Sequence, residues 1–168
     1  MRKLDFADLA NWCRDNGYEL DDWRPSLATT ARRIDLAIPN DAQALSEFID
    51  DLINIEQTEA ERLLWIRDWT MWNERSQEIG LEHLRLLVDK MDVGMQQKPG
   101  HIYGIRQVEW REAVALLTVP VLYGWDAHLF FQSGVALVDI SHESRISVSL
   151  PSGSKDAATR LVAWQDSA

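Results

Sequence analysis

The fold is predicted from residues Thr58–Asp92, which read TEAERLLWIRDWTMWNERSQEIGLEHLRLLVDKMD. Three of the chain's eight tryptophans, Trp65, Trp69 and Trp72, lie in it at i, i+4 and i+7. On an α-helix these three rings share one face. Aromatic stripes at helical spacing are more often buried in a core than exposed as a platform for a sugar or base. The stretch therefore predicts a central helix with its tryptophans in the core.

The ends of this helix are also predicted by the sequence. Thr58 and Glu61 have the spacing of a capping box, so the helix is expected to begin near Glu59. Gly80 is expected to end or kink it, because glycine adopts the left-handed conformation at little cost. A second helix is then predicted over Leu81–Met91.

The N-terminal third predicts two further helices and one strand. Asp5 is a suitable N-cap for a helix through Asp15, with Cys13 on its apolar face as a structural thiol. The segment 18–30 is expected to be irregular, because the residue before Pro25 is pushed out of the helical region. Alternation predicts a strand over Arg33–Ile38, and the spacing after Asn40 predicts an amphipathic helix over 41–55.

The C-terminal third changes to a period of two residues. A short helix is predicted over Glu109–Leu117 and an edge strand over 119–123, because Pro120 cannot donate to a central ladder. An antiparallel meander follows, and a final helix closes the chain. The three strands of the meander and the helix are predicted at Ala127–Gln132, Val135–Ile140, Arg145–Leu150 and Lys155–Gln165.

Helices before strands in this order are typical of the α+β class. We predict one α+β domain over residues 1–168, with N-terminal and central helices packed on a C-terminal antiparallel sheet. Its length and 46% apolar content suit a globular core. One cysteine, no apolar run of membrane-spanning length and no signal-like N-terminus favour a cytoplasmic location.

The charge of the chain is −10 and unevenly distributed. Eight acidic residues and no lysine or arginine lie between Arg33 and Arg62. Within that interval Glu47, Asp50 and Asp51 are expected on the solvent face of the 41–55 helix. An acidic surface disfavours direct contact with nucleic acid or anionic membranes and suits a basic protein partner.

A second group of polar residues is expected where the meander turns. A hairpin between the first two strands places Asp126 opposite Ser141 and His128 opposite Asp139. Asp126, His128, His142 and Glu143 then meet at one end of the sheet. Histidine with carboxylates suits acid–base or metal chemistry, but the same residues also bond local backbone in turns, which is the commoner role.

Three hypotheses of function follow. The first is an acidic interaction module, similar in principle to immunity and inhibitor proteins, which binds a basic protein through Glu47, Asp50 and Asp51. The second is a small enzyme or ligand-binding domain that uses the Asp126/His142 group. The third is a structural subunit. The sequence has no zinc, nucleotide or serine-hydrolase motif, so we expect no metal or cofactor.

Two stretches resemble a group of small bacterial proteins with a tryptophan-rich helix and paired C-terminal strands. They are WIRDWTMWNE, 65–74, and GWDAHLFF with VDISHESRISV within 124–148. The resemblance covers about a third of the chain. It implies an α+β domain and carries no activity with it.

Overall fold

The computed structural model describes residues 1–21, 24–56, 60–68, 74–90, 101–106, 109–162 and 164–165. Its main feature is a seven-stranded antiparallel sheet with strand order β1-β6-β5-β7-β8-β9-β4. These strands are β1 (Arg2–Leu4), β4 (Ala31–Leu36), β5 (Arg62–Asp68), β6 (His101–Ile105), β7 (Asp126–Phe131), β8 (Leu137–Ser141) and β9 (Arg145–Pro151). A separate hairpin joins β2 (Tyr18–Asp21) to β3 (Arg24–Leu27).

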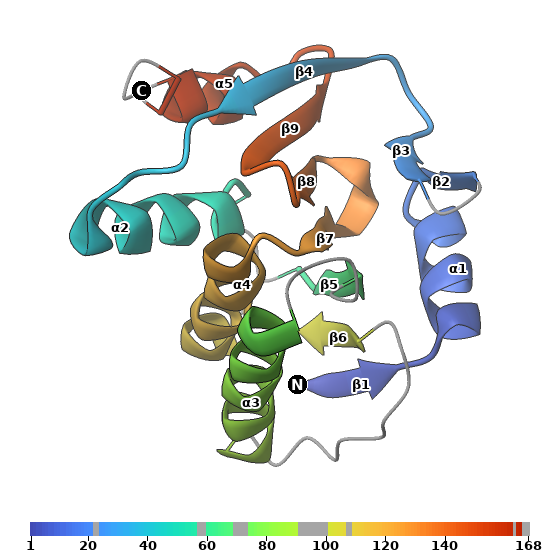
Figure 1. Cartoon of the computed structure of the whole chain (residues 1–168). Helices are drawn as coiled ribbons and strands as arrows, with labels where there is room; N and C mark the ends of the chain where they lie inside the picture. Colours follow the sequence, from blue (N-terminus) through green and yellow to red (C-terminus); the bar gives the residue numbers. More distant parts are fainter. Residues whose placement is uncertain are drawn as a thin grey trace.

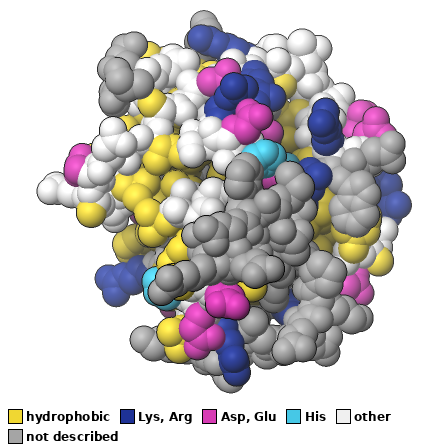
Figure 2. All heavy atoms as spheres, in the orientation of Figure 1, with side chains coloured by type: hydrophobic (Ala, Val, Ile, Leu, Met, Phe, Trp, Pro, Cys, Tyr) yellow, Lys and Arg dark blue, Asp and Glu magenta, His cyan; other side chains and the backbone are white. Residues whose placement is uncertain are grey.

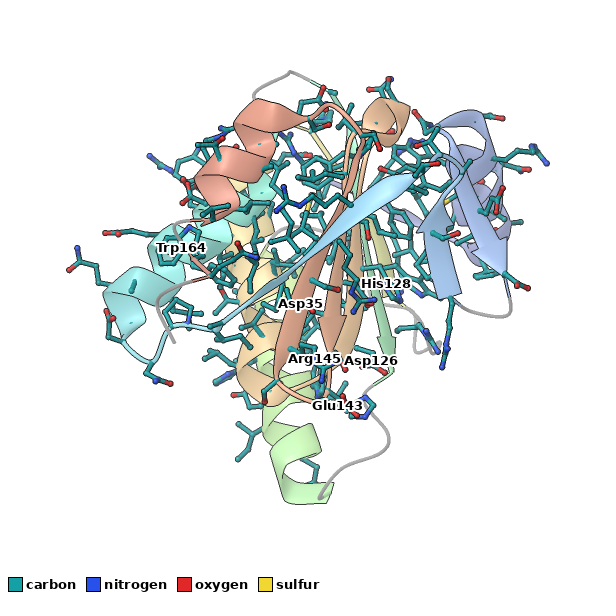
Figure 3. All side chains as sticks on the ribbon, turned by 90° about the horizontal axis from the view of Figure 1, so that it is seen from above. Asp35, Asp126, His128, Glu143, Arg145 and Trp164 are labelled. Atoms are coloured by element: carbon teal, nitrogen blue, oxygen red, sulfur yellow. The ribbon has the colours of Figure 1, made fainter. Side chains whose placement is uncertain are left out.

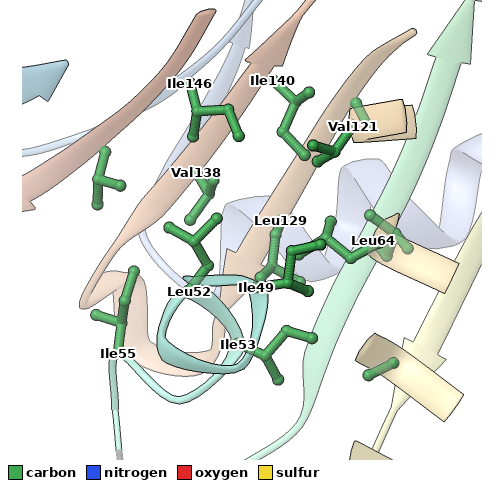
Figure 4. Packing of buried hydrophobic residues seen from close by; sticks show 14 of the residues in the cluster. Ile49, Leu52, Ile53, Ile55, Leu64, Val121, Leu129, Val138, Ile140 and Ile146 are labelled. Carbon is green, nitrogen blue, oxygen red and sulfur yellow. The ribbon is translucent and has the colours of Figure 1, made fainter. Parts of the chain in front are cut away.

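Most of the helices cover one face of this sheet (Figure 1). They are α2 (Ala42–Ile53), α3 (Glu74–Lys90), α4 (Trp110–Tyr123) and α5 (Lys155–Val162). α4 packs against both α2 and α3. Figure 4 shows Ile49, Leu52 and Ile53 of α2 beside Leu129 and Val138 of the sheet, and all five are buried. This side holds the larger apolar core.

Among the described residues, α1 (Phe6–Asp15) and the β2–β3 hairpin cover part of the opposite face. There Leu9, Cys13 and Tyr18 pack on Trp65 and Phe130. Burial raises the pKa of Cys13 to about 12, which keeps the thiol protonated and unreactive at neutral pH.

The predicted central helix is wrong in its first half. Residues Arg62–Asp68 form β5, the third strand from the β1 edge of the sheet. Leu63 and Trp65 point to the α1 side, while Leu64 and Ile66 point to the α2–α4 side. The sequence of a strand that is buried on both faces is an unbroken apolar run. The spacing of apolar residues cannot distinguish such a run from a buried helix.

The core position of Trp65 is nevertheless confirmed, since it is 1% exposed. Trp69 and Trp72 lie outside the described residues.

Gly80 neither ends nor kinks a helix, contrary to the prediction. It lies inside α3, which runs without a break from Glu74 to Lys90 and includes the predicted second helix up to Lys90; Met91 lies outside the described residues. A Cβ at position 80 would lie 2.6 Å from the Trp125 side chain, closer than real Cβ contacts. Glycine is therefore needed there because α3 packs directly on this indole ring.

The edge strand predicted around Pro120 is also wrong. Residues Trp110–Tyr123 form α4, which contains Pro120 near its C-terminal end and stops at Gly124 in the left-handed conformation. Valine and threonine in this segment favour a strand locally, and proline disfavours the interior of a helix. Tertiary packing overrides that preference, because Leu116, Leu117 and Val119 are buried against the sheet and neighbouring helices.

The segment 18–30, predicted to be irregular, contains the β2–β3 hairpin, in which Pro25 lies opposite Leu20. The hairpin tolerates this proline because, in the part of the chain that the structure describes, no third strand needs a hydrogen bond donated by residue 25.

Several predictions are confirmed. α1 begins after Asp5, whose carboxylate accepts from the Asp8 backbone N–H at 2.8 Å. α2 and α5 form close to their predicted positions, although Asp41 caps α2 in place of Asn40. β7, β8 and β9 form the meander with the predicted hairpin register. The α+β class is confirmed, but β1, β4, β5 and β6 join the same sheet, so it is not confined to the C-terminal third.

Candidate functional site

Asp126 and His142 meet where the meander turns, as predicted. Asp126 Oδ1 accepts from the His142 backbone N–H at 2.8 Å and lies 2.9 Å from His142 Nδ1. Asp126 is the first residue of β7, and His142 follows the end of β8. One carboxylate oxygen therefore holds both the backbone and the imidazole of the turn that leads into β9.

His128 belongs to a different pair. It lies opposite Asp139 across β7 and β8, with Nδ1 3.2 Å from Asp139 Oδ1. Among the described residues, neither nitrogen of the buried His128 ring has a hydrogen-bond partner. Burial raises the pKa of Asp139, but the charges of His128, Arg33 and Arg67 outweigh burial, so the pKa lies below its ordinary value.

Glu143 does not join either pair. Its side chain is exposed and lies 4.0 Å from Arg145 at the surface. Figure 3 shows Asp126, Glu143 and Arg145 near one end of the sheet, with His128 further along the same face. Of the predicted group of four, only Asp126 and His142 pair with each other, while His128 pairs with Asp139 and Glu143 lies apart at the surface. Among the residues that the structure describes, no three His, Cys, Asp or Glu side chains form a metal-binding group.

The geometry of Asp126 fits turn closure better than catalysis, since the aspartate is engaged by the local backbone as well as by His142. His128 differs, because a buried imidazole without a hydrogen bond is costly. Its neighbours are the rings of Trp65 and Phe130, with centroids 5.4 Å and 6.2 Å away.

The three acidic residues of the α2 surface have different environments. Glu47 is exposed and accepts from Gln43 at 3.0 Å. Asp51 is also exposed and accepts from Trp164 Nε1 at 2.8 Å. Asp50 is half-buried beside Asn54, contrary to the expected full exposure. These residues form a surface of mixed exposure on α2 that faces away from the sheet.

Other carboxylates of the acidic interval are neutralised locally. Glu61 bonds both Arg2 and Trp12 at 3.1 Å, and Asp35 lies 3.3 Å from Arg33. The acidic interval is therefore not one continuous acidic surface. Its carboxylates on α2 have no arginine partner among the described residues.

A groove between α3 and α4 was not predicted from the sequence. Its volume is about 340 Å³. The lining is mostly apolar and comprises His83, Leu86, Leu87, Ala115, Thr118, Val119, Leu122 and Tyr123. Figure 2 shows hydrophobic side chains at the surface in the region of α4 and α3.

The rim of this groove is unusual for a protein surface. Leu122 is 61% exposed and Leu86 49% exposed, while Tyr123 Oη lies 2.7 Å from His83 Nδ1 at one end. The sequence feature that indicates this groove is the apolar segment Val114–Val121. A helix with so many apolar residues has more apolar side chains than its sheet-facing side needs, so some of them lie at the surface. The prediction of a strand over 119–123 hides this signal, because it divides the apolar segment between two elements.

Comparison of the chain with protein-family models, curated proteins and solved structures finds no match. The resemblance to a bacterial group noted above thus stays an expectation. None of the described helices is both long and apolar enough to cross a membrane.

Proposed function

We propose that the protein is an interaction module, and that the groove between α3 and α4 docks an amphipathic, basic helix of a partner protein. The observation that carries this proposal is the exposure of Leu86 and Leu122 beside an apolar groove. Contiguous apolar surface of this kind is uncommon on monomers and often marks a binding site. A groove between two helices suits the apolar face of a third helix.

Charge favours a basic partner. The chain has a net charge of −10, and Glu47 and Asp51 are exposed on α2, the helix on the other side of α4 from α3. Opposite charge accelerates encounter, while burial of leucine side chains supplies most of the affinity. Leu122 is thus expected to contribute most of the apolar contact with the bound helix. The α2 carboxylates are expected to attract the basic partner and speed its association.

The test uses a fluorescent amphipathic peptide made of leucine and lysine, with a leucine/glutamate peptide of the same pattern as the control. Anisotropy should rise with the basic peptide and not with the acidic one. Leu122→Asn should weaken binding about tenfold, the equivalent of about 1.4 kcal/mol of lost apolar contact.

The matched control is Val162→Asn, which removes an exposed apolar side chain from α5. It should leave binding unchanged. Equal binding of both peptides, or equal loss in both variants, would mean that the groove is not the docking site.

A further inference from the structure

Strand β4 has a partner strand on only one of its two edges in the part of the chain that the structure describes. β4 is the last strand of the seven-stranded sheet and pairs on one side with β9, from Ala31 opposite Pro151 to Leu36 opposite Ile146. On its other side the described residues provide no strand. Figure 3, which looks down on this edge, shows β4 crossing in front of β9. An uncovered edge of six residues is a template for another strand.

The charges on this edge have a specific order. Arg33 and Asp35 are exposed and flank Ile34, whose side chain points into the core on the other face. The two charged groups contact each other at 3.3 Å, and both side chains are more than half exposed. Exposed ion pairs of this kind contribute little to stability. A closer opposite charge can therefore replace this contact at small cost.

We propose that two copies of this chain pair through β4, antiparallel about Ile34, so that their sheets join into one. In this register Arg33 lies opposite Asp35 of the second copy, and Asp35 lies opposite Arg33 of the second copy. Opposite charges at directly facing positions stabilise an antiparallel pair. The contact is the same for both copies, as twofold symmetry requires.

Neighbouring registers are disfavoured by the same two residues. In a symmetric antiparallel pair, one residue of β4 faces its own copy and marks the centre of the register. The neighbouring registers that keep the core-facing side chains on the core side have this centre at Arg33 or at Asp35. The first choice places Arg33 opposite itself, and the second places Asp35 opposite itself. Like charges that face each other are destabilising. The order Arg-Ile-Asp thus favours the register centred on Ile34 over its two neighbours.

Pairing at β4 leaves the α3/α4 groove open. Figure 1 shows β4 at one end of the sheet and α3 near the other end. The pairing therefore does not rest on the proposed interaction function, and either can fail without the other.

Sedimentation velocity over a concentration series tests the pairing. The wild-type chain should form a dimer as its concentration rises. Arg33→Asp and Asp35→Arg should each weaken dimerisation at least tenfold, because each places like charges opposite one another. A mixture of the two variants should form a heterodimer, since every facing pair then has opposite charges again.

Mixing the two variants distinguishes loss of the contact between copies from loss of a contact within one chain. Each single variant loses the Arg33–Asp35 contact within its own chain, and mixing cannot restore it. Arg14→Asp, at an exposed arginine of α1, is the charge-matched control and should dimerise like the wild type. A wild-type chain that stays monomeric throughout would overturn the proposal. Single variants that dimerise normally, or a mixture that stays monomeric, would do the same.

Discussion

His128 lies directly opposite Asp139 in the β7–β8 ladder, with 3.2 Å between Nδ1 and Oδ1. This pair belongs to a row that crosses the sheet from Trp65 through His128, Asp139 and Ser147 to Asp35. Trp65 is buried beneath α1, whereas Asp35 is exposed. Among the described residues, His128 therefore lies between the part of this face that α1 covers and the exposed Asp35.

Trp65→Ala should severely destabilise the protein. Trp65 is 1% exposed on the interior strand β5, so its removal leaves a large cavity against α1. The expected loss is about 3–5 kcal/mol of unfolding free energy. The denaturant midpoint measures this loss, and a midpoint that does not move would place the ring at the surface.

Tyr18→Phe should also destabilise, although it leaves the ring in place. The buried Tyr18 hydroxyl accepts from the Phe131 backbone N–H at 2.8 Å and lies 2.6 Å from the carbonyl oxygens of Phe131 and Ala136. Without it the Phe131 N–H loses this acceptor, which should cost about 1–3 kcal/mol.

Chemical denaturation of Tyr18→Phe beside Tyr123→Phe provides the comparison. Tyr123 is only partly buried, and its hydroxyl contacts His83 at the end of the groove. A loss no greater for Tyr18→Phe than for Tyr123→Phe would contradict the role of the buried hydroxyl.

Stability in acid should depend on Glu109. Burial raises its pKa, but hydrogen bonds from Arg106 and from the Met1 amino group outweigh burial and lower the pKa to about 2 from 4.5. A lowered pKa in the folded state means that the stabilisation is full above pH 4.5 and is lost as the pH falls towards 2.

Glu109→Gln should therefore lower stability at pH 7, by about 1.5–3 kcal/mol for hydrogen bonds to a charged group. It should also flatten the loss of stability between pH 4.5 and 2. Unfolding measured across that range gives both values. If the variant loses stability between pH 4.5 and 2 as steeply as the wild type, another group causes the acid sensitivity.

Glu47→Gln, Asp50→Asn and Asp51→Asn together should leave folding stability unchanged or slightly raised. Glutamine and asparagine keep an oxygen acceptor for Trp164 and Asn54, and the removed charges repel one another. The triple variant should slow association with the leucine/lysine peptide and reduce its salt dependence. A clear loss of stability would mean instead that these carboxylates support the fold.

The sequence predicted the parts of the fold that depend on local signals. Asp5 caps α1, and the strand alternation with one short turn places His128 opposite Asp139. It failed where burial on several sides removes the period, at β5 and α4. The groove could not be predicted for the same reason, because Leu86 and Leu122 become neighbours only after α3 and α4 pack together.

The most direct test of the interaction function is the position of the bound peptide, measured by methyl chemical shifts in an NMR titration with the leucine/lysine peptide. The predicted result is that the largest shifts occur at Leu86, Leu87 and Leu122, which line the groove, while Leu9 beneath the opposite face stays unchanged. Shifts centred on Leu9 and its neighbours, or none at saturating peptide, would contradict docking between α3 and α4.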